Sequence, residues 1–152
     1  MKKKKGKGGR PTKRMKEFKA QNKPAFIQIL TQIFAGKICP YCNQSTEYID
    51  SSYVYGKSYG MIYICKKCDA YCGVHKGTDK ALGRVANAEL RELKKLAHAT
   101  FDPIWQSNMK SRHEAYWWLS NQLNIPKEYT HIGFFGVETC KKVIKICKFE
   151  LQ

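Results

Sequence analysis

The chain has 152 residues, the size of one domain with or without an arm, and its 43% hydrophobic content is enough for a packed core. No apolar run approaches the roughly 18 residues of a membrane span, and no apolar segment follows the basic N-terminus as in a secretory signal. The formal net charge of +16 favours a polyanionic partner, because Lys and Arg that contact phosphates release counterions.

Residues 1–13 form a basic arm that we expect to be disordered, because it contains nothing that could be buried. Its Gly9-Arg10-Pro11 segment resembles the core of an AT-hook, in which an Arg-Pro unit lies in the minor groove of A·T-rich DNA. A generic basic arm or a solubilising tail explains the same composition. The candidate phosphate contacts in and beside the arm are Lys2, Lys3, Lys4, Lys5, Arg10, Lys13 and Arg14.

Residues 14–36 have the periodicity of helices, with Phe18, Ile29 and Ile33 near one face. Pro24 indicates a break, because proline suits the first position of a new helix. We expect the second helix to pack on the segment that follows it, and binding of a partner protein is the alternative.

Two Cys-x-x-Cys pairs lie within residues 37–78, and they are separated by enough residues for one β-hairpin. This spacing predicts a tetrahedral structural Zn²⁺ site, because each pair can turn two thiolates toward one point. An odd total of seven cysteines favours a reducing compartment over a disulfide framework. We expect Cys72, Cys140 and Cys147 to be buried thiols, while a second metal site that uses Cys72, His75, His98 or His131 is the alternative. The predicted ligands are Cys39, Cys42, Cys65 and Cys68.

Between and after these pairs, residues 46–55, 61–64 and 69–75 are β-prone and tyrosine-rich, which predicts a three-stranded sheet. Tyrosine rings exposed beside lysines would form a stacking platform for bases. The alternative is that the rings only cover a small core. The candidate nucleic-acid contacts here are Tyr55, Lys57, Tyr59, Lys66, Lys67, His75 and Lys76.

The second half of the chain is helical in pattern. Residues 82–100 predict a long helix with an apolar stripe opposite a basic face, and this face either follows a phosphate backbone or is simply solvated. A capping box at Ser111 starts the next helix, and a last helix starts near Val137. The fold class is therefore α+β, with a zinc ribbon (37–78) packed against a helical subdomain (79–152) of about three to four helices. The candidate contacts on the long helix are Arg84, Arg91 and Lys95.

Several strings, taken in order, resemble a family of small phage and prophage proteins described as a zinc-finger-containing domain of unknown function. They include Cys-Pro-Tyr-Cys at 39–42, Tyr-Gly-Lys-Ser-Tyr-Gly at 55–60 and His-Ile-Gly-Phe-Phe at 131–135. The resemblance covers residues 38–147 and implies the same four cysteine ligands, whereas Cys72 departs from the family pattern. It also implies pattern matches at His75, Arg84, Asn87, Glu89, Arg91, His98, Asp102, Trp105, Ser111, Tyr116 and His131.

These features favour a non-catalytic zinc-ribbon protein that binds DNA or RNA in the cytoplasm of a host cell, or in association with a virion. The first alternative is an interaction module that docks a host or virion protein, with no membrane partner. The second is a metal-dependent nuclease in which His75 acts, although no acidic pair offers a Mg²⁺ site.

Overall fold

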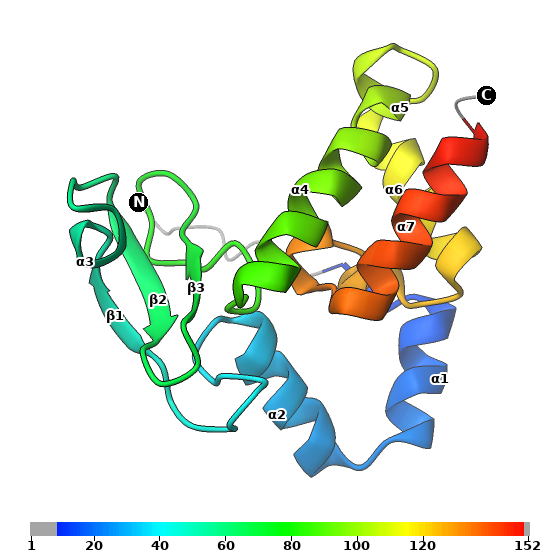
Figure 1. The fold of residues 1–152 in the computed structure, drawn as a ribbon. Coiled ribbons are helices and arrows are strands. Elements are labelled where there is room, and N and C mark those ends of the chain that lie inside the picture. The colour runs from blue at the N-terminus through cyan, green and yellow to red at the C-terminus, as the bar shows by residue number, and fades with distance from the viewer. Residues whose placement is uncertain (1–8, 151–152) are drawn as a thin grey trace, which may run out of the picture.

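The chain folds into a small β-sheet and a helical half that lie side by side, with α1 and α2 forming a V below them (Figure 1). The computed structural model describes residues 9–150, so Lys2, Lys3, Lys4 and Lys5 lie outside the described residues. The sheet contains β1 (Glu47–Asp50), β2 (Met61–Cys65) and β3 (Ala70–Gly73), with the single-turn α3 (Ser52–Tyr55) after β1. The helices are α1 (Lys13–Gln21), α2 (Pro24–Phe34), α4 (Ala88–Phe101), α5 (Pro103–Gln106), α6 (Arg112–Leu123) and α7 (Val137–Glu150), with 3₁₀ turns η1 (Lys127–Tyr129) and η2 (Ile132–Phe134).

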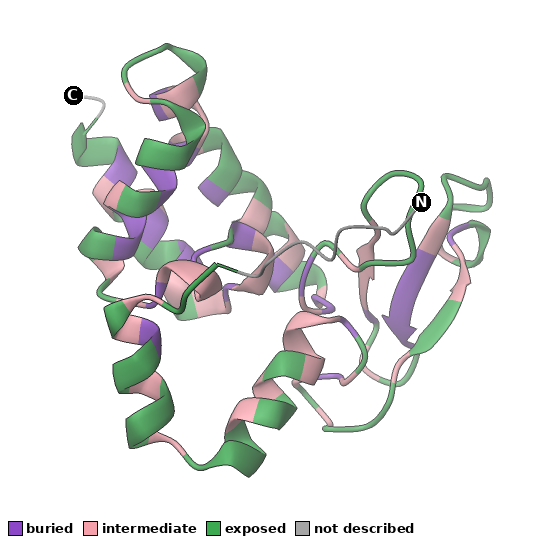
Figure 2. Cartoon of the chain, turned by 180° about the vertical axis from the view of Figure 1, so that it is seen from behind, coloured by how far each residue is buried: buried purple, intermediate pink, exposed green. Residues whose placement is uncertain are grey.

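The sheet is antiparallel in the order β1-β2-β3, which confirms the predicted α+β class and the three-stranded ribbon. In the register, Tyr48 lies opposite Tyr63 on β2, and Ile62 lies opposite Gly73 on β3. The central strand is almost wholly buried, as Figure 2 shows in purple. Its run of Ile, Tyr and Ile is typical of a strand that is covered on both faces.

The first strand is shorter than predicted, because it ends at Asp50 and not at Tyr55. The Asp50 carboxylate accepts hydrogen bonds from the Ser52 backbone N–H (2.8 Å) and the Ser58 hydroxyl (2.8 Å). An aspartate that bonds the backbone two residues on offers the chain a turn in place of a strand ladder. The chain therefore turns through α3, and Tyr55 at its end lies beside Tyr71 of β3, with ring centroids 6.1 Å apart.

The long helix predicted to start at residue 82 begins at Ala88, so this prediction was wrong by six residues. Residues 81–86 lie alongside β3 and bend at 82–84; at the end of the segment Tyr71 and Ala86 exchange two backbone hydrogen bonds of 3.1 and 3.0 Å. Because the N–H and C=O groups of Ala86 are bonded to Tyr71, they are not available for the hydrogen bonds of a helix that begins at residue 82. Asn87 then caps α4 by accepting a hydrogen bond from the Leu90 N–H.

The core of the helical half lies between α4, α6 and α7. Phe101, Ile104, Leu119 and Val143 are completely buried there. Ser111 accepts a hydrogen bond from the Glu114 N–H (3.1 Å), as the predicted capping box requires. This core contains no residue of the sheet, so each half has a hydrophobic core of its own.

The N-terminal helices attach mainly to η1 and η2 of the helical half. Thr12 caps α1 and donates two hydrogen bonds to the Glu128 carboxylate, from its N–H (3.1 Å) and its hydroxyl (2.7 Å). The last two residues of the predicted disordered arm (1–13) are therefore ordered, since Thr12 caps α1 and Lys13 begins it, whereas residues 1–8 lie outside the described residues. The ring of Phe34 stacks on Phe134 at 4.5 Å, so the end of α2 packs on the helical half and not on the sheet as expected.

None of the described helices is long and apolar enough to cross a membrane.

Candidate metal centre and the cleft beside it

The four predicted ligands converge on one point at the end of the sheet. The sulfurs of Cys39, Cys42, Cys65 and Cys68 all lie within 4.8 Å of one another, and those of Cys42 and Cys65 are 3.7 Å apart. Tetrahedral Zn–S bonds of about 2.3 Å place sulfurs about 3.8 Å apart, so the four sulfurs fit one Zn²⁺ ion. The prediction of a single structural zinc site is confirmed.

Backbone geometry aims each pair of sulfurs inward. In the first pair, the Asn43 N–H donates to the Cys39 carbonyl (2.8 Å), and the Cys39 N–H donates to the Gln44 carbonyl (2.9 Å). The residue after each pair, Asn43 or Asp69, has a left-handed backbone with φ of 60° or 49°. Asn and Asp tolerate this conformation better than other non-glycine residues. The two turns are therefore near repeats of each other, and they close on the metal from both sides.

The ligand thiols differ in how easily they lose a proton. The Gln44 backbone N–H lowers the pKa of Cys42 to about 7, whereas desolvation among the other thiols raises that of Cys68 to about 12. Four thiolates this close repel one another, so the full set ionises only when a dication neutralises them. The site therefore suits a metal that takes sulfur ligands and provides charge.

The metal centre also forms part of the core of the sheet. The buried cluster beneath the strands consists of Cys39, Tyr63, Cys65, Ala70 and Val85. Two of these five residues are ligands, so the apolar core of the sheet is small without the ion. Zinc therefore adds to a small hydrophobic core.

The other cysteines lie apart from this centre. The Cys72 thiol on β3 donates to the Gly83 carbonyl (3.3 Å), and burial raises its pKa to about 11. Cys140 and Cys147 are completely buried in the helical core, as predicted. Among residues 9–150, the four ligands are the one group of three or more His, Cys, Asp or Glu side chains that is close enough to hold a metal.

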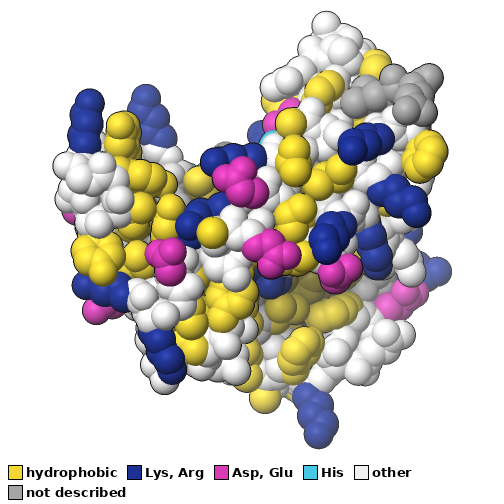
Figure 3. All heavy atoms as spheres, in the orientation of Figure 1, with side chains coloured by type: hydrophobic (Ala, Val, Ile, Leu, Met, Phe, Trp, Pro, Cys, Tyr) yellow, Lys and Arg dark blue, Asp and Glu magenta, His cyan; other side chains and the backbone are white. Residues whose placement is uncertain are grey.

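A cleft of about 390 Å³ separates the sheet from the helical half, and Figure 3 shows the notch between them. Tyr71, Cys72 and Gly73 of β3 line one wall, and residues of α4, α6 and η2 line the other. None of the described lining residues is acidic. The polar and aromatic side chains that line the cleft are Tyr55, Tyr71, Tyr116, His75, His98, His131, Arg91, Lys94, Lys95 and Arg112.

The fold brings four of the predicted nucleic-acid contacts together in this cleft, namely Tyr55, His75, Arg91 and Lys95. Arg91 is fixed there, because it donates to the Asp69 and Ala86 carbonyls and its guanidinium lies 4.1 Å from the Tyr71 ring centroid. Tyr59 is 72% exposed beside Tyr55, at a ring distance of 5.6 Å.

The other predicted contacts lie elsewhere. Arg84 is not on a basic helix face as predicted, because it precedes α4 and donates from Nε to the Phe134 carbonyl (2.7 Å). Lys66 pairs with Glu47 (3.2 Å) and lies over the Tyr53 ring, outside the cleft. The remaining candidates are exposed or lie on α1: Lys57, Lys67, Lys76, Arg10, Lys13 and Arg14, of which Arg14 bonds to Asn121 and Asn124 at the end of α6.

Sequence reasoning from charge and periodicity missed Lys94 and Arg112 as cleft residues. Arg112 sits at the start of α6, where its cation lies over the rings of Trp105 and Tyr116 at 5.5 and 5.6 Å. Tyr116 was indicated only by the family resemblance, and His131 by that resemblance and as a possible ligand of a second metal site. The cleft joins residues more than 50 positions apart, so no local pattern could reveal it.

Lys94 is mostly buried at the junction of the halves and donates to the Arg84 (3.1 Å) and Gly133 (2.9 Å) carbonyls. Burial lowers its pKa from 10.5 to about 8. Below about pH 8 Lys94 is charged in both the folded and the unfolded chain, and burying that charge lowers the free energy of unfolding. This penalty disappears as the pH rises from about 8 to 10.5, because the buried amine loses its proton first.

We compare the free energy of unfolding of the wild type with that of Lys94→Met. The wild-type value minus the variant value should rise by about 2–3 kcal/mol from about pH 7 to about pH 10. Urea unfolding at both pH values measures the difference, and the neighbouring Cys72 thiol is present in both proteins. Parallel pH profiles for the two proteins would contradict it.

The chain matches no curated protein and no solved structure. A family model described as a zinc-finger-containing domain matches residues 35–150, a range that includes the sheet, the four ligands and the helical half. The chain therefore belongs to the family of zinc-finger-containing domains.

Proposed function

We propose that this zinc-binding module is a non-catalytic nucleic-acid-binding protein, and that the cleft between its halves is the main contact. The observation that carries the proposal is the composition of the cleft. Four Lys and Arg, three His and three Tyr line it, and no described lining residue is acidic. Phosphates select such cations, and bases select such rings.

Neighbouring carboxylates leave most of this positive charge free. Asp69 lies 4.0 Å from Arg91, and Glu92 lies 3.1 Å from Lys95, with both carboxylates well exposed. Exposed pairs of this kind contribute little and exchange readily with other ions. A phosphate can therefore replace these weak partners, which supports an anionic ligand.

The aromatic side chains supply the second part of the argument. Tyr59, Tyr55 and Tyr71 follow one another at ring distances of 5.6 and 6.1 Å, from the exposed turn of the sheet into the cleft. The first two rings are largely exposed, so their faces remain available. Bases stack on such faces whatever their sequence, which favours weak sequence preference.

We expect the affinity for a labelled DNA or RNA oligonucleotide to fall steeply with salt, by about 10³-fold between about 50 and about 200 mM if some six phosphates are contacted. Lys95→Glu should weaken binding and reduce the slope of log K against log salt by about 1. Fluorescence anisotropy over a salt series measures both quantities.

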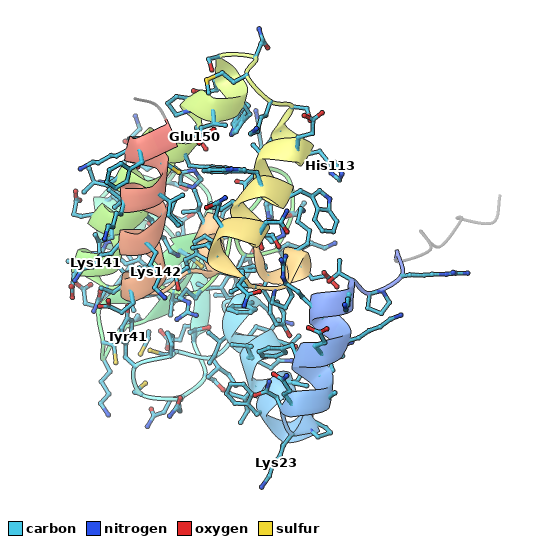
Figure 4. All side chains as sticks on the ribbon, turned by 90° about the vertical axis from the view of Figure 1, so that its right-hand side faces the viewer. Lys23, Tyr41, His113, Lys141, Lys142 and Glu150 are labelled. Atoms are coloured by element: carbon cyan, nitrogen blue, oxygen red, sulfur yellow. The ribbon has the colours of Figure 1, made fainter. Side chains whose placement is uncertain are left out.

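Lys141→Glu is the matched control, because Lys141 also pairs with a glutamate three residues earlier but lies on α7, outside the cleft. Figure 4 shows Lys141 and Lys142 on one side of the helical half and His113 on the other. Equal effects of the two variants, or affinity that does not change with salt, would contradict the cleft as the main contact.

One observation favours a protein partner as the second candidate function. Helix α2 has no buried residue, and its Phe26 and Ile29 are 49% and 47% exposed. This apolar face suits a host or virion protein. Co-purification of a protein that survives nuclease treatment and is lost in Ile29→Lys would support it over the nucleic-acid proposal.

A further inference from the structure

The cleft is not closed at its far end. A second cavity, of about 330 Å³, lies against α6 and shares Arg112, Tyr116 and His131 with the cleft. A third, of about 430 Å³, shares Lys127 with the second and reaches Lys13 at the start of α1. Shared lining residues place these cavities side by side, and we call the row the groove; it runs from Tyr55 at the end of α3 to α1, the helix that follows the basic arm.

Cations and rings lie next to each other along this groove. Lys127 lies over both Tyr116 and Trp117, with its Nζ 5.9 and 5.8 Å from the two ring centroids. Trp117 is 37% exposed, and its indole N–H donates to His113 (3.1 Å), which holds the ring at the rim. Lys127 and Trp117 thus pair a cation with an aromatic ring, as Arg91 and Tyr71 do in the cleft.

The groove also carries almost no negative charge. Across the three cavities, the one acidic residue among the described lining residues is Glu17, at the α1 end. The nearby Glu128 carboxylate already accepts two hydrogen bonds from Thr12, which also hold α1 against this end of the groove. An anion that follows the groove therefore meets cations over nearly its whole length.

These features fit a single strand better than a duplex. Each cavity lies within the about 300–1,000 Å³ range of pockets that enclose small ligands, so it has room for a nucleotide and not for a double helix. A duplex also hides the faces of its bases, whereas an unpaired strand can turn them onto rings such as Trp117.

We propose that the groove binds single-stranded nucleic acid along its length, from the sheet tyrosines through the cleft to the start of α1. This proposal rests on the proposed function and adds the kind of strand and its path. It ends the path of the strand at Lys13, where the described part of the chain enters α1.

The test compares single-stranded oligonucleotides of about 4 to about 20 nucleotides with a duplex of the longest length, using the full-length protein. We expect the single strand to bind at least about tenfold more tightly than the duplex, with affinity rising with length until the groove is filled. Trp117→Ala should weaken binding of the longest strand at least about fivefold and leave the shortest, held in the cleft, unaffected. The same series run with DNA and with RNA oligonucleotides shows which sugar is preferred.

Phe26→Ala is the control, because it removes a similarly exposed ring on α2, outside all three cavities. Circular dichroism confirms that each variant is folded. Duplex binding as tight as single-strand binding, or an unchanged long-strand affinity in Trp117→Ala, would overturn the groove while Lys95→Glu still weakens binding through the cleft. Failure of every oligonucleotide to bind at low salt would instead overturn the proposed function itself.

Discussion

Replacing Cys65 with Ser is expected to abolish zinc binding and unfold the sheet while the helical core stays folded. Cys65 is both a ligand and a member of the small core of the sheet. Structural zinc contributes on the order of 10–16 kcal/mol at sites of this kind, and the sheet buries too little apolar area to fold without it. The metal content per chain should fall from one to zero, and the amides of β1–β3 should lose protection from hydrogen exchange while those of α4, α6 and α7 keep it.

Cys72→Ser is the matched control for this experiment. Cys72 lies in the same sheet, but its thiol donates to the Gly83 carbonyl and contributes nothing to the metal site. A serine hydroxyl can donate the same hydrogen bond, so this variant should keep one zinc per chain. Loss of zinc with retained sheet protection in Cys65→Ser would show that the ion is not structural, and retention of zinc would show that Cys65 is not an essential ligand.

Gly83→Ala is expected to cost several kcal/mol of stability, roughly 3–5, because it opens the junction between the halves. A Cβ at position 83 would clash with the Gly133 carbonyl oxygen, which is backbone and cannot move aside as a side chain could. That same oxygen accepts hydrogen bonds from the Arg84 N–H (3.0 Å) and Lys94 Nζ (2.9 Å). Thermal or urea unfolding of the zinc-loaded protein measures the loss.

Gly136→Ala provides the comparison, because a Cβ there would meet only the Arg84 guanidinium at an ordinary contact distance of 3.5 Å. We expect a change within about 0.5 kcal/mol for this variant. Similar stabilities for the two alanine variants would mean that the chains at Gly83 and Gly133 do not pack this closely in solution.

The metal site could be predicted because its chemistry is local. Two Cys-x-x-Cys pairs require only a tight turn each and a hairpin between them, so spacing alone identifies the ligands. The capping box at Ser111 and the break at Pro24 were predictable for the same reason, since each depends on backbone groups within one helical turn. The family resemblance agreed with the residues matched by the family model.

The cleft could not be predicted, because it depends on where the segment 81–86 runs. Its apolar periodicity fits a helix, but tertiary pairing with β3 gives its backbone other partners, and Arg84 turns into the interior. Asn87 is a recognisable helix cap, and attention to it would have placed the start of α4 correctly. Tyr71, Arg91 and Arg112 line one cleft only because the two halves pack side by side, and that packing is not visible in the sequence.

One wall of the cleft is a sheet whose small core includes ligands of the metal centre, and this has a thermodynamic consequence. A ligand that touches both walls binds only chains in which the sheet is folded, and those are the chains that hold zinc. Linkage then requires that such a ligand and zinc tighten each other's binding by the same factor. Scarcity of zinc would then lower the fraction of chains that can bind such a ligand, without any change to the helical half.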